Sequence, residues 1–181
     1  MQQLHTFGGN DDLLQELINA RVRFLVIGGL AVKFYAQQRE ADDLDLLLEQ
    51  SPENADQIFQ AFAALKLNPG FPKELISSYS KHPQHLPLKA VHYADLVTRP
   101  ELDFQGEWDA SQEGLIGQNR VRFASLNLLT SLKTGSDREK DFLDLGHPNV
   151  FAVDLPSPPR ICPGSSNKGI RSRQARSILI R

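Results

Sequence analysis

Two short apolar runs, separated by a glycine pair and a helix-like segment, form the most informative stretch of the chain. Residues 24–27 (Phe-Leu-Val-Ile) have the length and branching of a buried strand, and Gly28 and Gly29 follow directly. The glycines let the backbone turn sharply or approach a ligand closely, because neither has a Cβ. Residues 30–36 then read as a short helix, whose first N–H groups suit an anionic group. A second apolar run at 44–48 predicts another strand.

Two acidic residues stand at the start of this second run. Side chains alternate along a strand, so Asp43 and Asp45 are expected to project from one face, with Leu44 on the other. Two carboxylates on one strand face repel each other unless a cation lies between them. We therefore predict a divalent-metal site here. The alternative is a solvated strand end beside the acidic residues Glu40 and Asp42.

This stretch resembles the signature of the nucleotidyltransferase superfamily with a DNA polymerase beta-like palm, in particular its small stand-alone bacterial members. The resemblance is carried by Gly28-Gly29 and by the later run Arg39-x-Ala41-x-Asp43-Leu-Asp45-Leu-Leu. In that family a strand–Gly-Gly–helix element holds the nucleoside triphosphate, and the Asp-x-Asp strand binds two magnesium ions. A later strand supplies a third carboxylate. The resemblance extends over roughly residues 13–146, and its first block is the most specific.

The resemblance implies that Asp43, Asp45 and Asp95 are the catalytic residues and hold two Mg²⁺ ions. Asp95, in Tyr93-Ala-Asp-Leu-Val, matches the third carboxylate, which helps to activate the nucleophile. Asp103 is the rival for this position, and Asp95 is preferred. Hard magnesium ions take carboxylate oxygens as ligands, and two such ions can activate an attacking hydroxyl and steady the leaving pyrophosphate.

The resemblance also implies a set of nucleotide-binding residues: Gly28, Gly29, Arg39, Lys133 and Asp141. Arg39 is expected to contact phosphate or to brace the Asp-x-Asp strand through a bidentate pair, with a surface position as the alternative. Lys133 and Asp141 match two later helical elements of the family, in the first of which a lysine approaches the triphosphate. For Asp141 the alternative is an exposed helix with charge pairs, and the glycines alone would also suit a tight turn.

Two positions depart from the family pattern. Leu30 stands where many relatives carry a serine directly after the glycines, so the phosphate contact there would fall to backbone N–H groups. Ala41 stands where relatives often carry Thr or Ser. These departures leave open a catalytically degenerate palm that serves as a binding or antitoxin module. A third alternative is an unrelated α/β regulatory domain.

The remaining pattern predicts an α/β domain with a small mixed sheet flanked by helices, resembling the nucleotidyltransferase palm. Asn10, Asp11 and Asp12 are expected to cap a helix with apolar residues at 13, 14, 17 and 18. Ser51-Pro52 is typical of a helix start, and residues 68–70 (Asn-Pro-Gly) of a helix end. Residues 71–87 are expected to form a loop or irregular strand, and residues 88–97 and 121–123 to form strands. Residues 102–104 are expected to pair with the strand at 88–97 or to continue it. Two further helices are expected, one from Ser125 to Lys133 and one from Asp137.

The chain divides into a nucleotidyltransferase-like domain at 1–150 and a tail at 151–181. The tail is rich in Pro, Gly and Ser and carries six basic residues and one acidic residue, which predicts a flexible segment. The first 150 residues carry 14 basic and 21 acidic residues, which argues against a broad nucleic-acid-binding face. The single cysteine, Cys162, rules out an internal disulfide. No apolar run approaches a membrane span, so a cytoplasmic protein without a membrane partner is expected.

Other motifs point to no additional chemistry. His82-x-x-His85 lacks cysteine partners, so a zinc site is not expected. The chain contains neither a P-loop nor a dinucleotide fingerprint. The aromatic residues Tyr93, Phe104 and Trp108 are assigned to the core or to a pocket wall.

The predicted function is a magnesium-dependent transferase that moves a nucleoside monophosphate from a triphosphate, with ATP favoured, to an acceptor hydroxyl. The acceptor stays open among a small molecule, a protein and a tRNA end, and the basic tail favours RNA only weakly. Bacterial members that this chain resembles include toxins and antitoxins. A cognate toxin or antitoxin is therefore a candidate partner.

Overall fold

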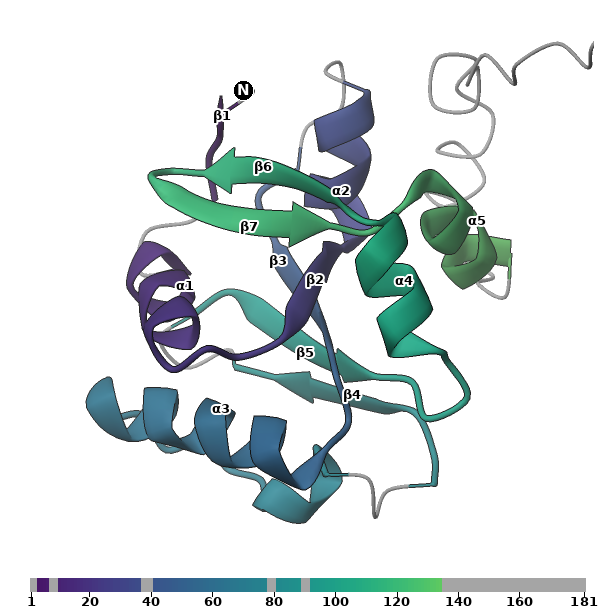
Figure 1. The fold of residues 1–181 in the computed structure, drawn as a ribbon. Helices are drawn as coiled ribbons and strands as arrows, with labels where there is room; N and C mark the ends of the chain where they lie inside the picture. Colours follow the sequence, from purple (N-terminus) through teal and green to yellow (C-terminus); the bar gives the residue numbers. More distant parts are fainter. Residues whose placement is uncertain (1–2, 7–9, 37–40, 78–80, 89–91, 135–181) are drawn as a thin grey trace, which may run out of the picture.

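A computed structural model describes residues 3–6, 10–36, 41–77, 81–88 and 92–134. Within them the chain forms one mixed seven-stranded sheet flanked by helices (Figure 1), which confirms the predicted α/β class. The strands are β1 (Gln3–Leu4), β2 (Phe24–Ile27), β3 (Leu44–Leu48), β4 (Gln84–Pro87), β5 (Ala94–Thr98), β6 (Gln112–Ile116) and β7 (Asn119–Phe123). The helices are α1 (Asn10–Asn19), α2 (Gly28–Tyr35), α3 (Pro52–Ala64), α4 (Phe104–Ala110) and α5 (Leu126–Thr134), with a 3-10 helix at Lys73–Leu75.

The two strands predicted from the apolar runs form the centre of the sheet. Its strand order is β1-β6-β7-β2-β3-β5-β4. β2 and β3 are antiparallel, with Phe24 opposite Leu48 and Ile27 opposite Asp45. β3 is parallel to β5, whereas β2 is parallel to β7. Every residue of β2 is buried, as expected for a central strand covered on both faces.

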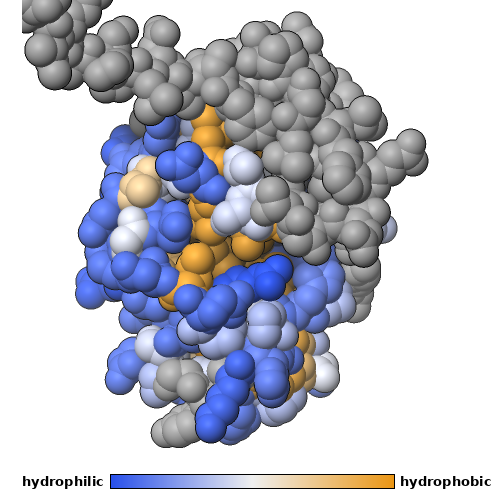
Figure 2. All heavy atoms as spheres, turned by 90° about the vertical axis from the view of Figure 1, so that its right-hand side faces the viewer, coloured by the Kyte–Doolittle hydropathy of each residue, from blue (hydrophilic) through white to orange (hydrophobic). Residues whose placement is uncertain are grey.

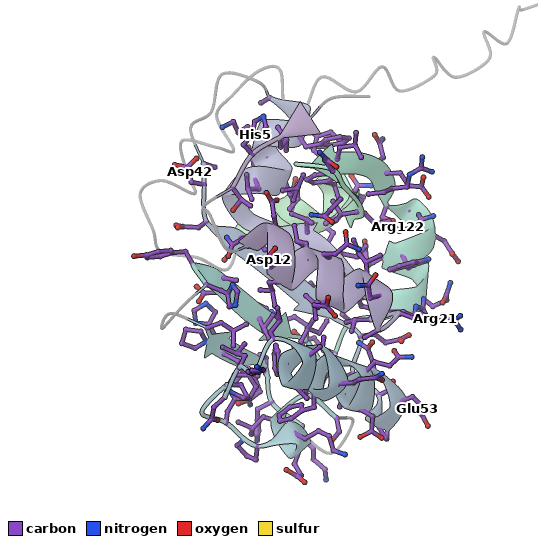
Figure 3. The ribbon with its side chains drawn as sticks, turned by 90° about the vertical axis from the view of Figure 1, so that its left-hand side faces the viewer. His5, Asp12, Arg21, Asp42, Glu53 and Arg122 are labelled. Atoms are coloured by element: carbon purple, nitrogen blue, oxygen red, sulfur yellow. The ribbon has the colours of Figure 1, made fainter. Side chains whose placement is uncertain are left out.

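Helices cover both sides of this sheet. α1 and α3 pack against each other on one side, and α2 and α5 contact each other on the other side (Figures 1 and 3). The ring of Phe34 in α2 stacks on that of Phe123 in β7, with centroids 4.2 Å apart. Tyr35 Oη donates to the carbonyl oxygen of Ala124 at 3.0 Å. These contacts hold α2 against the end of β7.

The predicted helix boundaries are confirmed where a cap marks them. Ser51 Oγ accepts a hydrogen bond from the backbone N–H of Asn54 at 3.1 Å, at the start of α3. Ser125 Oγ accepts from the N–H of Leu128 at 3.2 Å in the first turn of α5. α2 begins at Gly28, two residues before the expected start, because the glycine pair itself forms its first turn.

Two helices end with a basic residue in the left-handed conformation. Arg21 follows α1 with φ +61°, and Lys66 follows α3 with φ +54°. The N–H of Val22 donates to the carbonyl of Leu17, and the N–H of Leu67 donates to that of Phe62. Both ends are therefore Schellman motifs, in which glycine is the usual residue at the left-handed position.

The reading of residues 71–87 as a loop or irregular strand is confirmed in its strand part. The readings of 88–97 and 102–104 are corrected, since the strand in the first of these segments, β5, covers Ala94–Thr98. Residues 71–87 contain the 3-10 helix and β4, which pairs antiparallel with β5 and extends the sheet by one strand. Residues 102–104 neither pair with β5 nor continue it, because Asp103 Oδ1 accepts from the N–H of Gly106 and caps α4. α4 and β6 were not predicted. The helix expected from Asp137 and the tail at 151–181 lie outside the described residues.

One face of the molecule retains apolar surface. Figure 2, which views the side where α4 and α5 lie, shows a strip of apolar side chains bordered by hydrophilic ones. Among the described helices, none combines the length and apolar character needed to cross a membrane.

Candidate active site

Two of the predicted catalytic carboxylates are neighbours on adjacent strands. β3 and β5 are parallel, and their register places Asp45 directly beside Asp95. Residues paired in this way project from the same face of a sheet, and adjacent strands lie about 4.8 Å apart. Leu44 and Leu46, on either side of Asp45, are fully buried and fix the strand. Two carboxylates are thus held side by side, an arrangement that favours a cation between them.

The glycine pair is positioned against Asp45. Gly28 has φ +67°, and a Cβ on it would stand 1.8 Å from Asp45 Oδ2. The Asp45 carboxylate therefore lies against the first residue of α2. No side chain of the described part of the chain caps this helix, so its first N–H groups and the positive end of its dipole face the same region as the carboxylate.

Asp95 is held by a histidine from the next strand. His85 Nε2 in β4 lies 3.0 Å from Asp95 Oδ2. The other carboxylate oxygen, Oδ1, is buried and accepts no hydrogen bond from any residue that the structure describes. A buried carboxylate oxygen without a partner is costly. Asp95 is therefore fixed through one oxygen, and the other retains capacity for a ligand.

Asp43 lines a pocket beside this pair. It stands one residue before β3 and is exposed. The pocket has a volume of about 230 Å³ and is lined by Asp43, Tyr93, Ala94 and Asp95. Tyr93 is 59% exposed, and its carbonyl oxygen accepts from the N–H of Leu44 at 3.2 Å. Asp43 and Asp95 thus open onto one cavity, with an exposed aromatic residue in its wall.

The donor set fits a hard divalent cation only in part. Carboxylate oxygens from Asp45 and Asp95, one of them lacking a partner, are the ligands that Mg²⁺ prefers. However, no three Asp, Glu, His or Cys side chains in the described ranges gather closely enough to form a complete metal site. Mg²⁺ commonly uses one or two carboxylates and completes its shell with water and substrate phosphates. The carboxylates present fit this arrangement, in which water and substrate phosphates complete the shell of the ion.

The other predicted residues are placed as follows. The rival carboxylate Asp103 caps α4, whereas Asp95 stands beside Asp45. Lys133 lies in the last turn of α5. Arg39 and Asp141 lie outside the described residues. The contact between His85 and Asp95 was not predicted, because it joins two strands whose pairing the sequence does not reveal.

No protein-family model and no curated protein matches the chain. Among solved structures, it is similar to an antigenic nucleotidyltransferase-like protein from Paracoccidioides brasiliensis. The two chains are 16% identical, the match covers 75% of this chain and 73% of that one, and the TM-score is 0.41. A likeness of this extent does not by itself assign a family or an activity.

Proposed function

We propose that this protein is a nucleotidyltransferase that binds a nucleoside triphosphate together with Mg²⁺ at the site of Asp43, Asp45 and Asp95. We call it the carboxylate site. The observation that carries the proposal is the pairing of Asp45 with Asp95 next to Gly28. A helix N-terminus preceded by a glycine pair suits phosphate groups, and the adjacent carboxylates suit the metal ion that accompanies them.

The roles of individual side chains follow from their positions. Asp45 and Asp95 would hold the metal ion, and Asp43 would complete the site from the pocket rim. The bound metal would neutralise the charge that develops on the phosphates. The first turn of α2 would bind the triphosphate, and Tyr93 offers an exposed ring on which a base can stack.

The proposed reaction is an in-line displacement. The oxygen of an acceptor hydroxyl forms a bond to the α-phosphorus, the bond from that phosphorus to the bridging oxygen breaks, and pyrophosphate leaves. The hydroxyl proton passes to the Asp95 carboxylate. Positioning and charge stabilisation account for most of the rate in such reactions, because the protein has little covalent chemistry to perform.

Calorimetric titration with each nucleoside triphosphate, with and without Mg²⁺, tests this proposal. We expect Mg²⁺-dependent binding that falls at least tenfold in Asp45→Asn and in Asp95→Asn. Asp103→Asn is the matched control, because asparagine also caps a helix and the fold should be retained. Two results would contradict the assignment. One is a loss of binding in Asp103→Asn alone, and the other is binding that depends neither on Mg²⁺ nor on the substitutions of Asp45 and Asp95.

A second function is a non-catalytic nucleotide-binding or antitoxin module on the same fold. It is favoured by the lack of three gathered metal-binding side chains in the described ranges and by Leu30 after the glycine pair. Pyrophosphate release distinguishes the two functions. The transferase releases pyrophosphate from a triphosphate when an acceptor is present, whereas the module binds without turnover.

A further inference from the structure

A second pocket lies at the opposite ends of the central strands. It has a volume of about 310 Å³, and Trp108 and four arginines are among the residues that line it: Arg21, Arg23, Arg120 and Arg122. We call it the arginine pocket. β2 runs between the two sites. Its first residue, Phe24, lines the arginine pocket and pairs with Leu48, whereas its last residue, Ile27, pairs with Asp45. Figure 3 shows Arg21 and Arg122 on one side of the molecule and Asp42 on the other.

Two of the arginines form a rigid wall with the tryptophan. The guanidinium carbons of Arg23 and Arg122 lie 4.8 Å and 4.9 Å from the Trp108 ring centroid. Arg23 Nη1 is 2.7 Å from Glu49 Oε1, and Arg122 Nη2 is 3.0 Å from Glu113 Oε1. These partners hold the flat guanidinium groups against the indole, which leaves a preformed surface of planar groups.

The other two arginines supply charge that the pocket does not balance. Arg120 is 70% exposed and reaches Glu113 only at 3.7 Å, although that carboxylate already serves Arg122. Arg21 is exposed, and within the described ranges no carboxylate pairs with it. Four guanidinium groups thus face two partner carboxylates, Glu49 and Glu113. This excess of positive charge stands on a domain that is otherwise acidic.

Glu113, which pairs with Arg120 and Arg122, also lines the pocket, and the remainder of the lining is apolar. Ile18, Val22, Phe24 and Val121 line the pocket between the arginines. A site with planar and apolar walls and cationic edges suits a ligand that combines a flat ring with an anionic group. A volume of about 310 Å³ is at the lower end of small-molecule sites and matches one nucleotide unit better than an extended peptide.

We propose that the arginine pocket binds a nucleoside monophosphate unit, either as a free mononucleotide or as one nucleotide of an RNA strand. Arg21 and Arg120 bind the phosphate, and the base lies against the wall formed by Trp108 and the two fixed arginines. Stacking of a base on aromatic rings or on arginine guanidinium planes, and phosphate binding by arginine, are common elements of nucleotide recognition. This site is separate from the carboxylate site, so the two proposals stand or fall independently.

The fluorescence of Trp108, the only tryptophan in the chain, reports on this pocket directly. The protein is titrated with AMP, GMP, CMP and UMP, with adenosine and inorganic phosphate as partial ligands, and with a 5′-phosphorylated RNA tetranucleotide. We expect saturable quenching by at least one mononucleotide or by the RNA, weakening as salt is raised. Response to mononucleotides identifies a free ligand, and response to the tetranucleotide alone identifies a strand.

Two variants and a matched control assign the binding to the arginines. Arg120→Gln and Arg21→Gly should each weaken binding about tenfold. Lys66→Gly is the control for Arg21→Gly, because both replace a left-handed basic residue at the end of a helix, and Lys66 does not line the pocket. Asp45→Asn should leave this binding unchanged.

Three results would overturn the proposal. The first is the absence of any saturable change with the mononucleotides and with the RNA. The second is equal binding of adenosine and AMP, or of inorganic phosphate and AMP, since the site would then not recognise base and phosphate together. The third is an equal effect of Arg21→Gly and Lys66→Gly, which would show that the weaker binding comes from the lower net charge or stability of the protein and not from the loss of Arg21 in the pocket.

Discussion

Gly28 and Asp45 are packed so closely that position 28 has no room for a side chain. A methyl group there would stand 1.8 Å from Asp45 Oδ2, and the backbone of Gly28 has φ +67°. Space and conformation therefore demand glycine independently. The glycine pair seen in the sequence thus does more than turn the chain, because it lets a carboxylate approach the start of a helix.

We predict that Gly28→Ala costs more than about 3 kcal/mol of unfolding free energy, because it combines a left-handed backbone with a clash. Gly70→Ala is the matched control. Gly70 has φ +75°, and no atom lies within 4 Å of the place that a Cβ would take there, so alanine should cost only about 1 kcal/mol. Denaturant unfolding of both variants provides the comparison.

The double variant Gly28→Ala/Asp45→Ala separates the two causes. Removing the carboxylate should relieve the clash and leave a cost close to that of Gly70→Ala, apart from the loss of Asp45 itself. If the double variant is as unstable as the sum of the two single variants, the close contact does not limit position 28, and this account of the glycine is wrong.

The sequence predicted the elements that have strong local signals. The apolar runs at 24–27 and 44–48 predicted the bounds of β2 and β3, and Ser51-Pro52 predicted the start of α3. α4 was missed because it is only seven residues long and includes Gly106, which is unfavourable inside a helix. β6 begins with Gln112 and Glu113, which are typical of a loop, and it becomes a strand through its pairing with β7.

The candidate site was predictable only where its residues are close in sequence. Asp43 and Asp45 were found from their spacing, whereas the choice between Asp95 and Asp103 needed the strand register. The arginine pocket was not predicted, because it joins residues near position 22 to residues 108–122. Long-range pairing, which no local pattern encodes, brings such residues together.

Asn54 links the first turn of α3 to the ends of β2 and β3. Its side chain is buried, accepts from the N–H of Arg23 at 2.8 Å, and donates to the carbonyls of Arg23 and Glu49 at 3.0 and 2.8 Å. We predict that Asn54→Ala lowers the unfolding free energy by about 3 kcal/mol, since the N–H of Arg23 and the carbonyl of Glu49 lose their side-chain partner and the carbonyl of Arg23 keeps only its bond from the N–H of Glu49.

Gln15→Ala is the control for Asn54→Ala. It removes an exposed side-chain hydrogen bond to Asn19 Oδ1, and exposed changes of this kind stay within about 0.5 kcal/mol. Chemical denaturation of both variants at pH 7 measures the difference. Equal small effects would show that water replaces the Asn54 contacts.

Tyr35 should make the stability of the fold fall at high pH. Burial raises the pKa of its phenol from 10.0 to about 12. Between these values the unfolded chain loses the phenol proton while the folded chain keeps it, so the stabilisation is complete below pH 10 and is lost as pH rises towards 12.

Tyr35→Phe tests this effect. Below pH 10 the variant should be less stable by about 1 kcal/mol, because the hydrogen bond to Ala124 is missing. As pH rises from 10 to 12 the difference between wild type and variant should shrink, and the subtraction cancels the other groups that titrate there. A constant difference across this range would show that the phenol titrates normally.

His85 positions Asp95, and its removal should weaken the proposed metal–nucleotide site. The imidazole nitrogen lies 3.0 Å from one carboxylate oxygen, while the other oxygen has no partner among the described residues. Without this contact, Asp95 can rotate and must be ordered again when the ligand binds. Loss of such an outer contact typically costs about tenfold in metal affinity.

We therefore predict that His85→Ala weakens Mg²⁺-dependent triphosphate binding about tenfold, and that His85→Gln, which retains an N–H donor, recovers part of the loss. His82→Ala, on the same segment, should have little effect. Because no three metal-binding side chains gather closely in the described ranges, the metal alone should bind weakly and the triphosphate should strengthen its binding. Stronger triphosphate binding in His85→Ala would show that the histidine competes with the metal for Asp95, and tight binding of Mg²⁺ without nucleotide would show that the protein side chains alone complete the metal site.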